Sequence, residues 1–197
     1  MKMTWCRFTA AGKTSFGIVE GDQVVPVDGT PWIGYQRSSE KLALASVKLL
    51  IPVVPVTFYC AGVNYAEHVI KMAKKRGEEP KLPKRAEIGY RANNALIEHE
   101  GNIIKPKDSG EVFQYEGVLV AVIGKQGKNI PKEQALDHVF GWTIGNDVSE
   151  RTWQRGDRTF WRSKNADTFK PMGPWIVTGV HPRDMTTIIR SEEHTSE

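Results

Sequence analysis

Apolar and polar residues alternate over short stretches through most of the chain, a pattern typical of half-buried β-strands. Near the N-terminus, residues 4–10 and 14–29 alternate around glycine-containing breaks and predict a small antiparallel β unit. Further strand-like segments, separated by turns, lie at 95–106, 115–125, 138–147 and 173–180. The pattern therefore predicts a mainly β protein with few helices, of the α+β class.

One helix stands out between these strands. The pattern predicts a buried strand over 56–60, then a helix that Asn64 caps and that runs through Met72 to about Arg76, where Gly77 ends it. Residues 74–85 are charged, rich in Gly and Pro, and almost free of large apolar side chains. We expect that stretch to form an exposed, mobile loop.

Composition changes along the chain suggest its organisation. An apolar run begins near residue 50, so we expect a small N-terminal β unit over 1–50 and a main domain over 51–189. Residues 190–197 contain no apolar side chain and are expected to form a polar tail outside any core. We also expect the main domain to be incomplete at its C-terminal end.

The overall charge favours an anionic partner without identifying it. The chain has 27 Lys and Arg against 23 Asp and Glu, a net charge of +4, which suits a small anion as well as a nucleic acid. Cys6 and Cys60 have neither a metal-ligand nor a disulfide spacing and are expected to be small buried side chains. Without a long apolar run or an apolar leader, the expected location is the cytoplasm, away from membranes.

Two carboxylates occupy unusual positions. Glu116 heads a strand whose apolar face carries Val118, and Asp147 ends the next long strand. Asp147 is either the N-cap of a following helix or a site residue. Nearby in the sequence are basic and polar side chains that would complete a cluster of oxygen ligands and anion binders, namely Arg151, Gln154, Lys164 and Asp167.

Four sequence blocks carry a resemblance to a known family. They are GVNYAEHV at 62–69, YEGVLVAVIGK at 115–125, GWTIGNDVSERTWQ at 141–154 and KNADTFKPMGPWIVT at 164–178. Together, in this order, they resemble the fumarylacetoacetate hydrolase family, which includes 2-hydroxyhepta-2,4-diene-1,7-dioate isomerases and acylpyruvate hydrolases. The resemblance implies a mixed β-sandwich or β-roll, a homodimer, and metal-dependent hydrolysis, decarboxylation or isomerisation of a small keto or enol acid in aromatic compound catabolism.

The resemblance also implies residue roles. Glu116 and Asp147 would bind Mg²⁺, or Mn²⁺ or Ca²⁺, hard ions that prefer carboxylate oxygens. His68 would be a general base on a mobile helix, and Lys164 would stabilise a developing oxyanion. Substrate binding would fall to Arg91, Arg151 and Gln154. Taken alone, a helical histidine or a basic side chain would more often be an ordinary surface residue.

Two departures from the family pattern open a second hypothesis. Val118 stands where the family has a third acidic metal ligand, and Lys71 stands where better-known members pair a Glu with the histidine. The alternative to a metal-dependent enzyme is therefore a catalytically impaired member with a binding or assembly role. Nucleic-acid binding by the basic, aromatic run at 151–164 ranks last, because that run overlaps two of the family blocks.

Overall fold

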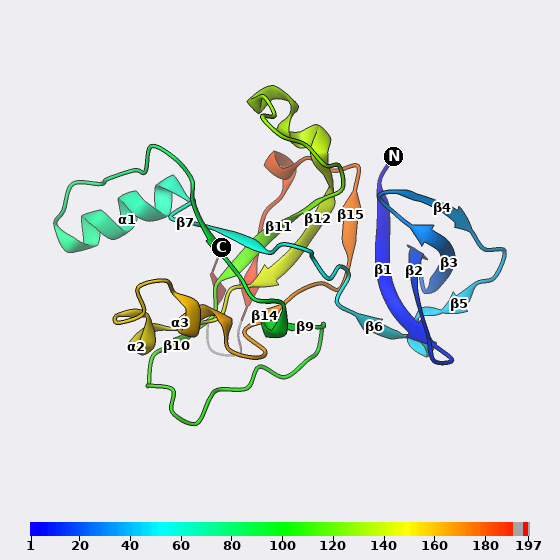
Figure 1. The fold of residues 1–197 in the computed structure, drawn as a ribbon, viewed down its shortest axis with the longest axis horizontal. Coiled ribbons are helices and arrows are strands. Elements are labelled where there is room, and N and C mark those ends of the chain that lie inside the picture. Colours follow the sequence, from blue (N-terminus) through cyan, green and yellow to red (C-terminus); the bar gives the residue numbers. More distant parts are fainter. Residues whose placement is uncertain (191–194, 197) are drawn as a thin grey trace.

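The computed structural model describes residues 1–190 and 195–196. Strands, nearly all paired antiparallel, outweigh the few helices, which confirms the predicted class (Figure 1). The expected polar tail at 190–197 lies mostly outside the described residues.

The strands are short, and most follow one another in antiparallel hairpins and meanders. In chain order they are β1 (Met3–Ala10), β2 (Lys13–Glu20), β3 (Gln23–Thr30), β4 (Gly34–Arg37), β5 (Leu42–Ala43), β6 (Lys48–Leu50), β7 (Tyr59–Gly62), β8 (Glu87–Tyr90), β9 (Leu96–Ile97), β10 (Phe113–Gln114), β11 (Gly117–Ile123), β12 (Val139–Asn146), β13 (Ser149–Glu150), β14 (Lys170–Pro171), β15 (Ile176–Thr178), β16 (Ile189–Arg190) and β17 (Thr195–Ser196). The helices are α1 (Ala66–Arg76), α2 (Arg151–Gln154) and α3 (Trp161–Asn165), with 3-10 turns at Leu44–Ser46, Asn93–Ala95, Lys132–His138 and Pro182–Asp184.

One large sheet joins the N-terminal strands to strands from the second half of the chain. Its order is β11-β12-β15-β1-β2-β3-β4, with β5 added to β3 and β6 added to β1. Strand β1 pairs antiparallel with β15, so that Met3 lies opposite Thr178. The N-terminal strands form the blue hairpins of Figure 1, and they share their sheet with the body. The boundary near residue 50 stays a prediction.

The largest core cluster combines residues from both parts of that sheet. Its buried members are Trp5, Ile18, Val25, Val27, Val122 and Ile176. A second cluster holds Cys6, which is buried as predicted, with Phe8 and Val24. Strands β11 and β12, which lead to the candidate site, are therefore anchored to a core that the N-terminal hairpins help to form.

Helix α1 ends as predicted and begins differently. Gly77 adopts the left-handed conformation, with φ of 68°, and its backbone N–H bonds the carbonyls of Ala73 and Lys74. The N-cap is Tyr65, and no side chain accepts a hydrogen bond there, so the predicted Asn64 cap is wrong. The following stretch to residue 85 is exposed almost throughout, as predicted.

The predicted buried strand at 56–60 is also wrong. Strand β7 covers Tyr59–Gly62 and pairs with β8, in a small sheet separate from the large one. Among the described residues no core cluster includes β7, and both Val56 and Tyr59 are exposed. An apolar run forms a buried strand only if another layer covers it, and the sequence pattern does not show whether such a layer is present.

Candidate active site

The ends of two paired strands bring the two predicted carboxylates together. Strands β11 and β12 run antiparallel with Gly117 opposite Asn146, which places the residue before one strand beside the residue after the other. The Asp147 backbone N–H donates to the Glu116 carbonyl at 2.8 Å, and the Glu116 N–H donates to Asn146 Oδ1 at 2.9 Å. Backbone pairing therefore fixes both acids at one edge of the sheet.

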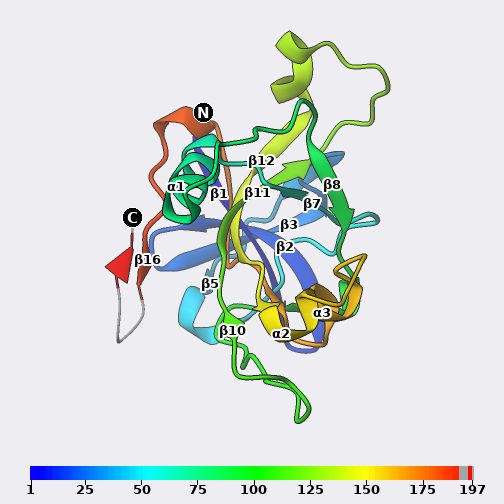
Figure 2. The ribbon, with the colours of Figure 1, turned by 90° about the vertical axis from the view of Figure 1, so that its left-hand side faces the viewer.

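A cleft of about 1430 Å³ opens over this edge, between the strand ends, α1 and the α2–α3 pair. Figure 2 shows α2 and α3 next to each other. Every residue to which the resemblance gave a role lines this cleft, and so does the side chain that replaces the third acid; they are His68, Arg91, Glu116, Val118, Asp147, Arg151, Gln154 and Lys164. Asp167, in contrast, accepts a hydrogen bond from Asn94 and does not line the cleft.

Lys164 links the two carboxylates. Its Nζ lies 3.0 Å from Glu116 Oε2 and 3.0 Å from Asp147 Oδ2, and the side chain is almost fully buried. Helix α3 holds it in place, because Asp157 accepts hydrogen bonds from the backbone N–H and the hydroxyl of Ser163 at the start of this helix. The amine reaches the cleft at the point where both acids face it.

Asp147 lines the cleft and is not a helix cap. The N-cap of α2 is Glu150, whose side chain accepts from the Trp153 backbone N–H, so the helix-cap alternative is wrong. Asp147 is 5% exposed, and Arg91 grips it with Nε at 2.9 Å and Nη2 at 3.0 Å. Arg91 also lines the cleft, as predicted for a substrate-binding residue, but its guanidinium is engaged with this acid.

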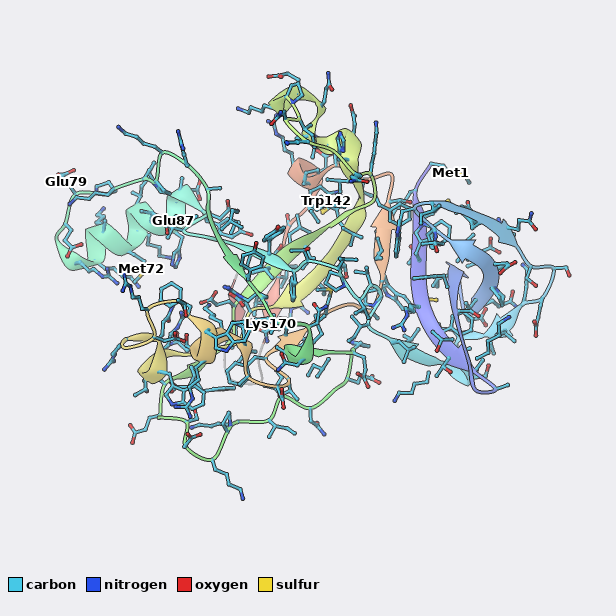
Figure 3. All side chains as sticks on the ribbon, viewed as in Figure 1. Met1, Met72, Glu79, Glu87, Trp142 and Lys170 are labelled. Carbon is cyan, nitrogen blue, oxygen red and sulfur yellow. The ribbon has the colours of Figure 1, made fainter. Side chains whose placement is uncertain are left out.

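Sequence reasoning missed a second cation on Asp147. Lys170 Nζ lies 2.9 Å from Asp147 Oδ1 and also donates to the carbonyls of Val148 and Phe169 at 3.1 and 3.0 Å. It is 3% exposed and does not line the cleft, and Figure 3 shows it near the centre of the molecule. The one available signal was its place in the otherwise apolar run around β14, where a lysine is out of pattern.

These contacts and the burial of the cluster shift the pKa values of Asp147, Lys170 and Cys60. Burial opposes ionisation of Asp147, but the Arg91 hydrogen bonds and the charges of Lys170 and Lys164 outweigh it and hold its pKa well below the usual range. Burial lowers the pKa of Lys170 to about 8, and the charge of Asp147 offsets only part of that effect. Burial, together with the Asp147 charge, raises the pKa of the Cys60 thiol, which lies 3.7 Å from Asp147 Oδ2. All three groups are held in one charge cluster.

Glu116 has its own basic partner, Arg151, which also lines the cleft. Its Oε1 accepts from Arg151 Nη2, and Arg151 also donates through Nε to Gln114 at 2.9 Å and through Nη1 to Gln154 at 2.8 Å. Ser149 donates to the same Glu116 oxygen at 3.2 Å. Each of the three Arg151 nitrogens donates one hydrogen bond, to Gln114, Gln154 or Glu116. A guanidinium carries five N–H groups, so two N–H groups of Arg151 remain for a ligand.

His68 lies on the remaining wall, on the first turns of α1. Its side chain is exposed, and the neighbouring position Lys71 does not line the cleft. The structure therefore places the predicted base on an exposed part of the cleft lining, whereas Lys164 of the same cleft is buried.

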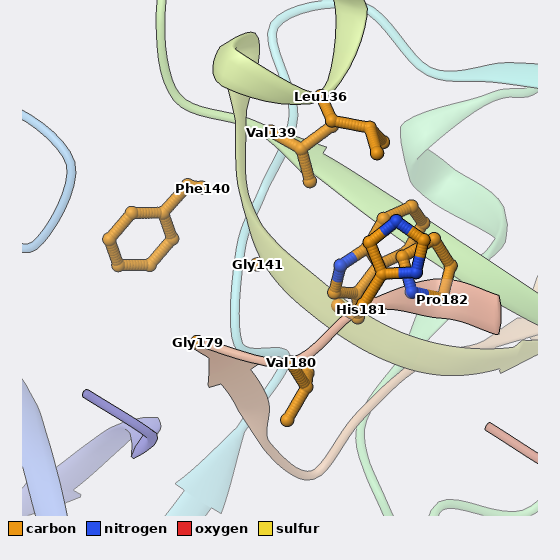
Figure 4. A pocket seen from close by; sticks show the side chains of 9 residues that line it. Leu136, Val139, Phe140, Gly141, Gly179, Val180, His181 and Pro182 are labelled. Carbon is orange, nitrogen blue, oxygen red and sulfur yellow. The ribbon is translucent and has the colours of Figure 1, made fainter. Parts of the chain in front are cut away.

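A second, smaller cavity lies elsewhere and is not a candidate for the active site. It measures about 110 Å³ and is enclosed mainly by apolar and backbone groups around the start of β12 and the end of β15 (Figure 4). Its one ionisable side chain, His181, accepts a hydrogen bond from the Arg183 backbone N–H. None of the predicted site residues lines it.

The donor set around Glu116 and Asp147 does not fit the divalent ion that the resemblance implies. A carboxylate offers about four lone-pair sites, and four cationic nitrogens already occupy those of Asp147: Arg91 Nε and Nη2, Lys164 Nζ and Lys170 Nζ. Val118 supplies no oxygen. Within the described residues, no three His, Cys, Asp or Glu side chains converge as a metal-binding group.

The formal charges lead to the same conclusion. Four cations, Arg91, Arg151, Lys164 and Lys170, contact two carboxylates, which leaves the cluster at +2 before any ion is added. Carboxylate sites bind Mg²⁺ through negative charge, and this cluster has an excess of positive charge.

Comparison with known sequences agrees with the resemblance of the four blocks. The profile described as "Fumarylacetoacetate (FAA) hydrolase C-terminal" matches residues 57–194, and the one described as "Rv2993c-like, N-terminal" matches residues 3–52. Protein Rv2993c of Mycobacterium tuberculosis is 40% identical over 141 residues, which cover 72% of this chain and 51% of that protein. Oxaloacetate tautomerase YisK of Bacillus subtilis is 38% identical over 138 residues, covering 68% and 44%.

Solved structures agree with the fold as well. A crystal structure described as 2-hydroxyhepta-2,4-diene-1,7-dioate isomerase from Mycobacterium marinum matches with a TM-score of 0.78 and 31% identity, covering 91% of this chain and 68% of that one. The chain spans about half the length of the two relatives named above. Among the described residues, no helix is long and apolar enough to cross a membrane. With the family profile matching most of its length, the chain belongs to the fumarylacetoacetate hydrolase family.

Proposed function

We propose that this chain carries the reacting cleft of an enzyme that acts on a small keto or enol acid, by hydrolysis, decarboxylation or isomerisation. The observation that carries the proposal is the buried amine of Lys164 between Glu116 and Asp147, in a cleft that a histidine also lines. Magnesium dependence is not part of the proposal, because the site's own cations already occupy Asp147.

Among these reactions the site favours a keto–enol isomerisation. In that reaction a base removes a proton from the carbon next to a carbonyl, the C–H electron pair forms the C=C bond, and the carbonyl π pair moves to oxygen. Protonation of the enolate oxygen then gives the enol, and in the reverse direction the enol loses its O–H proton and carbon takes up a proton to give the keto form. The protein needs to supply only a base, a cation next to the enolate oxygen and a group that binds the substrate carboxylate.

The residues present can fill these three roles. His68 on α1 is the candidate base, because an imidazole exchanges protons near neutral pH. Lys164 is the cation for the enolate oxygen, and Arg151 has two N–H groups left for a substrate carboxylate. Two of the comparison proteins are named for reactions of this kind, an oxaloacetate tautomerase and a dioate isomerase, which supports the proposal.

The α2–α3 region argues against the nucleic-acid hypothesis. Arg151 and Lys164 turn inward to the carboxylates, Asp157 is bonded at the start of α3, and Arg162 stacks on Trp153 at 4.0 Å. Two of the five basic side chains in this run, Arg151 and Lys164, are thus paired with the carboxylates of the cleft. The homodimer implied by the family stays a prediction, which light scattering would check.

The experiment is to follow the loss of enol absorbance of oxaloacetate in the ultraviolet, with Lys164→Met, Arg151→Gln and His68→Gln. Lys164→Met should lower kcat by about 10²-fold or more, since it removes the charge that faces the enolate. Arg151→Gln should mainly raise KM. The matched control is Lys13→Met, an exposed lysine on the N-terminal hairpin, which should leave both constants unchanged.

Two results would contradict the proposal. Turnover that persists in Lys164→Met would remove the buried amine from the chemistry. Binding of keto acids without turnover of any of them would favour the other hypothesis, an impaired member with a binding role, as the Val118 and Lys71 departures allow.

A further inference from the structure

The positive charge around Asp147 has a consequence for what the cleft binds. Lys170 does not line the cleft, and its three N–H donors are matched by the Asp147 carboxylate and two backbone carbonyls. It acts as a fixed counter-ion and cannot leave to make room for a metal without stranding a buried ammonium, which is costly.

Arg91 fixes the same acid from another direction. It binds both Asp147 oxygens and uses Nη1 on the Tyr90 carbonyl at 3.0 Å, with only 8% of its side chain exposed. A bidentate guanidinium is held more rigidly than a single ammonium contact. Asp147 is therefore paired by two residues besides Lys164.

We propose that the cleft takes a small dicarboxylate directly, on Arg151 and Lys164 and without a divalent ion, because Arg91 and Lys170 supply the positive charge that the ion would bring. This inference rests on the proposed function and specifies its substrate class. The cluster carries +2, so a dianion neutralises it and a monoanion leaves it unbalanced. The donors that remain are two N–H groups on Arg151 and one on Lys164, enough for one carboxylate and a neighbouring oxygen.

The test compares malonate, a dianion, with malonamate, which has the same size and one charge fewer. Both are titrated into the protein by calorimetry, in metal-stripped buffer and again with millimolar Mg²⁺. Malonate should bind with the same Kd in both buffers, and malonamate at least about tenfold more weakly, the usual cost of losing one charged hydrogen-bonding partner. Arg151→Gln should weaken malonate by a similar factor.

A second measurement examines the ion alone. Mn²⁺ titrated into the unsubstituted chain should show no bound signal by electron paramagnetic resonance. The paired change Val118→Glu with Lys170→Met adds a carboxylate and vacates one lone-pair site on Asp147 Oδ1, so it should create Mn²⁺ binding, whereas Lys170→Met alone should give much less. Circular dichroism of each variant identifies a misfolded one.

The outcomes separate this inference from the proposed function. Tight Mn²⁺ binding to the unsubstituted chain, or malonate binding that needs Mg²⁺, would overturn the inference while leaving a keto-acid enzyme in place. Equal affinities for malonate and malonamate would also overturn it. A different result would contradict the proposed function, namely that oxaloacetate and related keto acids are not turned over with or without the metal.

Discussion

At the scale of single residues, Asp147 is the side chain on which most of the site depends. It is a buried carboxylate in contact with Arg91, Lys164 and Lys170. Removing one partner of a buried ion pair leaves the others uncompensated, and here three cations would be left around a neutral group.

We expect Asp147→Asn to lower the free energy of unfolding by about 3–5 kcal/mol at pH 7. The pKa of Asp147 is depressed in the folded protein, so its contribution is complete above the unfolded value of about 4 and is lost as the pH falls toward the lower folded value. The difference between the two proteins should therefore narrow below about pH 4, by about 1.4 kcal/mol per pH unit.

Urea unfolding at several pH values measures this difference. Asp137→Asn is the matched control, because Asp137 is an exposed acid on the 3-10 turn and should change stability by less than about 0.5 kcal/mol. A difference that widens as the pH falls would show that Asp147 is not the ionised partner of these cations.

At the scale of elements, the sequence predicted the strands of the site better than the charges around it. The ends of β11 and β12 could be located from the apolar pattern, and an antiparallel pairing of those strands is enough to join Glu116 to Asp147. Lys170 could not be located in this way, since nothing in a pattern of polar positions says whether a lysine points out or in. The prediction of a buried strand at 56–60 failed for the same reason, because burial depends on which layer covers a strand.

Helix α1 and the loop after it lead to a second prediction. Residues 77–82 are exposed, and Ala73 is the one buried residue of the helix, so few contacts hold this segment down. His68 and Met72 nevertheless face the cleft. We expect trypsin to cut between Lys74 and Lys84 and malonate to slow the cut, as the helix settles over a bound ligand.

The comparison needs a site that the ligand should not affect. Cleavage in the exposed stretch around Lys125 and Lys128, away from the cleft, provides it. If malonate protected both stretches equally, or did not protect the stretch between Lys74 and Lys84, α1 would have no part in ligand binding.

At the scale of the whole molecule, the question is whether the N-terminal hairpins form an independent unit. A boundary near residue 50 follows from composition, and the two matched profiles meet in the same region. The sheet, however, runs through β1 and β15 without interruption, and Trp5 packs in one core with Val122 and Ile176. Two sequence units can thus share one cooperative core.

We therefore expect the hairpins and the body to unfold together. Trp5→Ala removes a large buried side chain at the junction and should cost about 3–5 kcal/mol, shifting a single calorimetric transition to lower temperature. Trp5→Phe is the control, since it keeps most of the apolar contact and removes an indole N–H that has no hydrogen-bond partner among the described residues. Hydrogen exchange should slow or speed together in β2 and β12, because both belong to the same sheet. Two separate transitions, with Trp5→Ala moving only the one assigned to residues 1–50, would instead establish independent domains that happen to share a sheet edge.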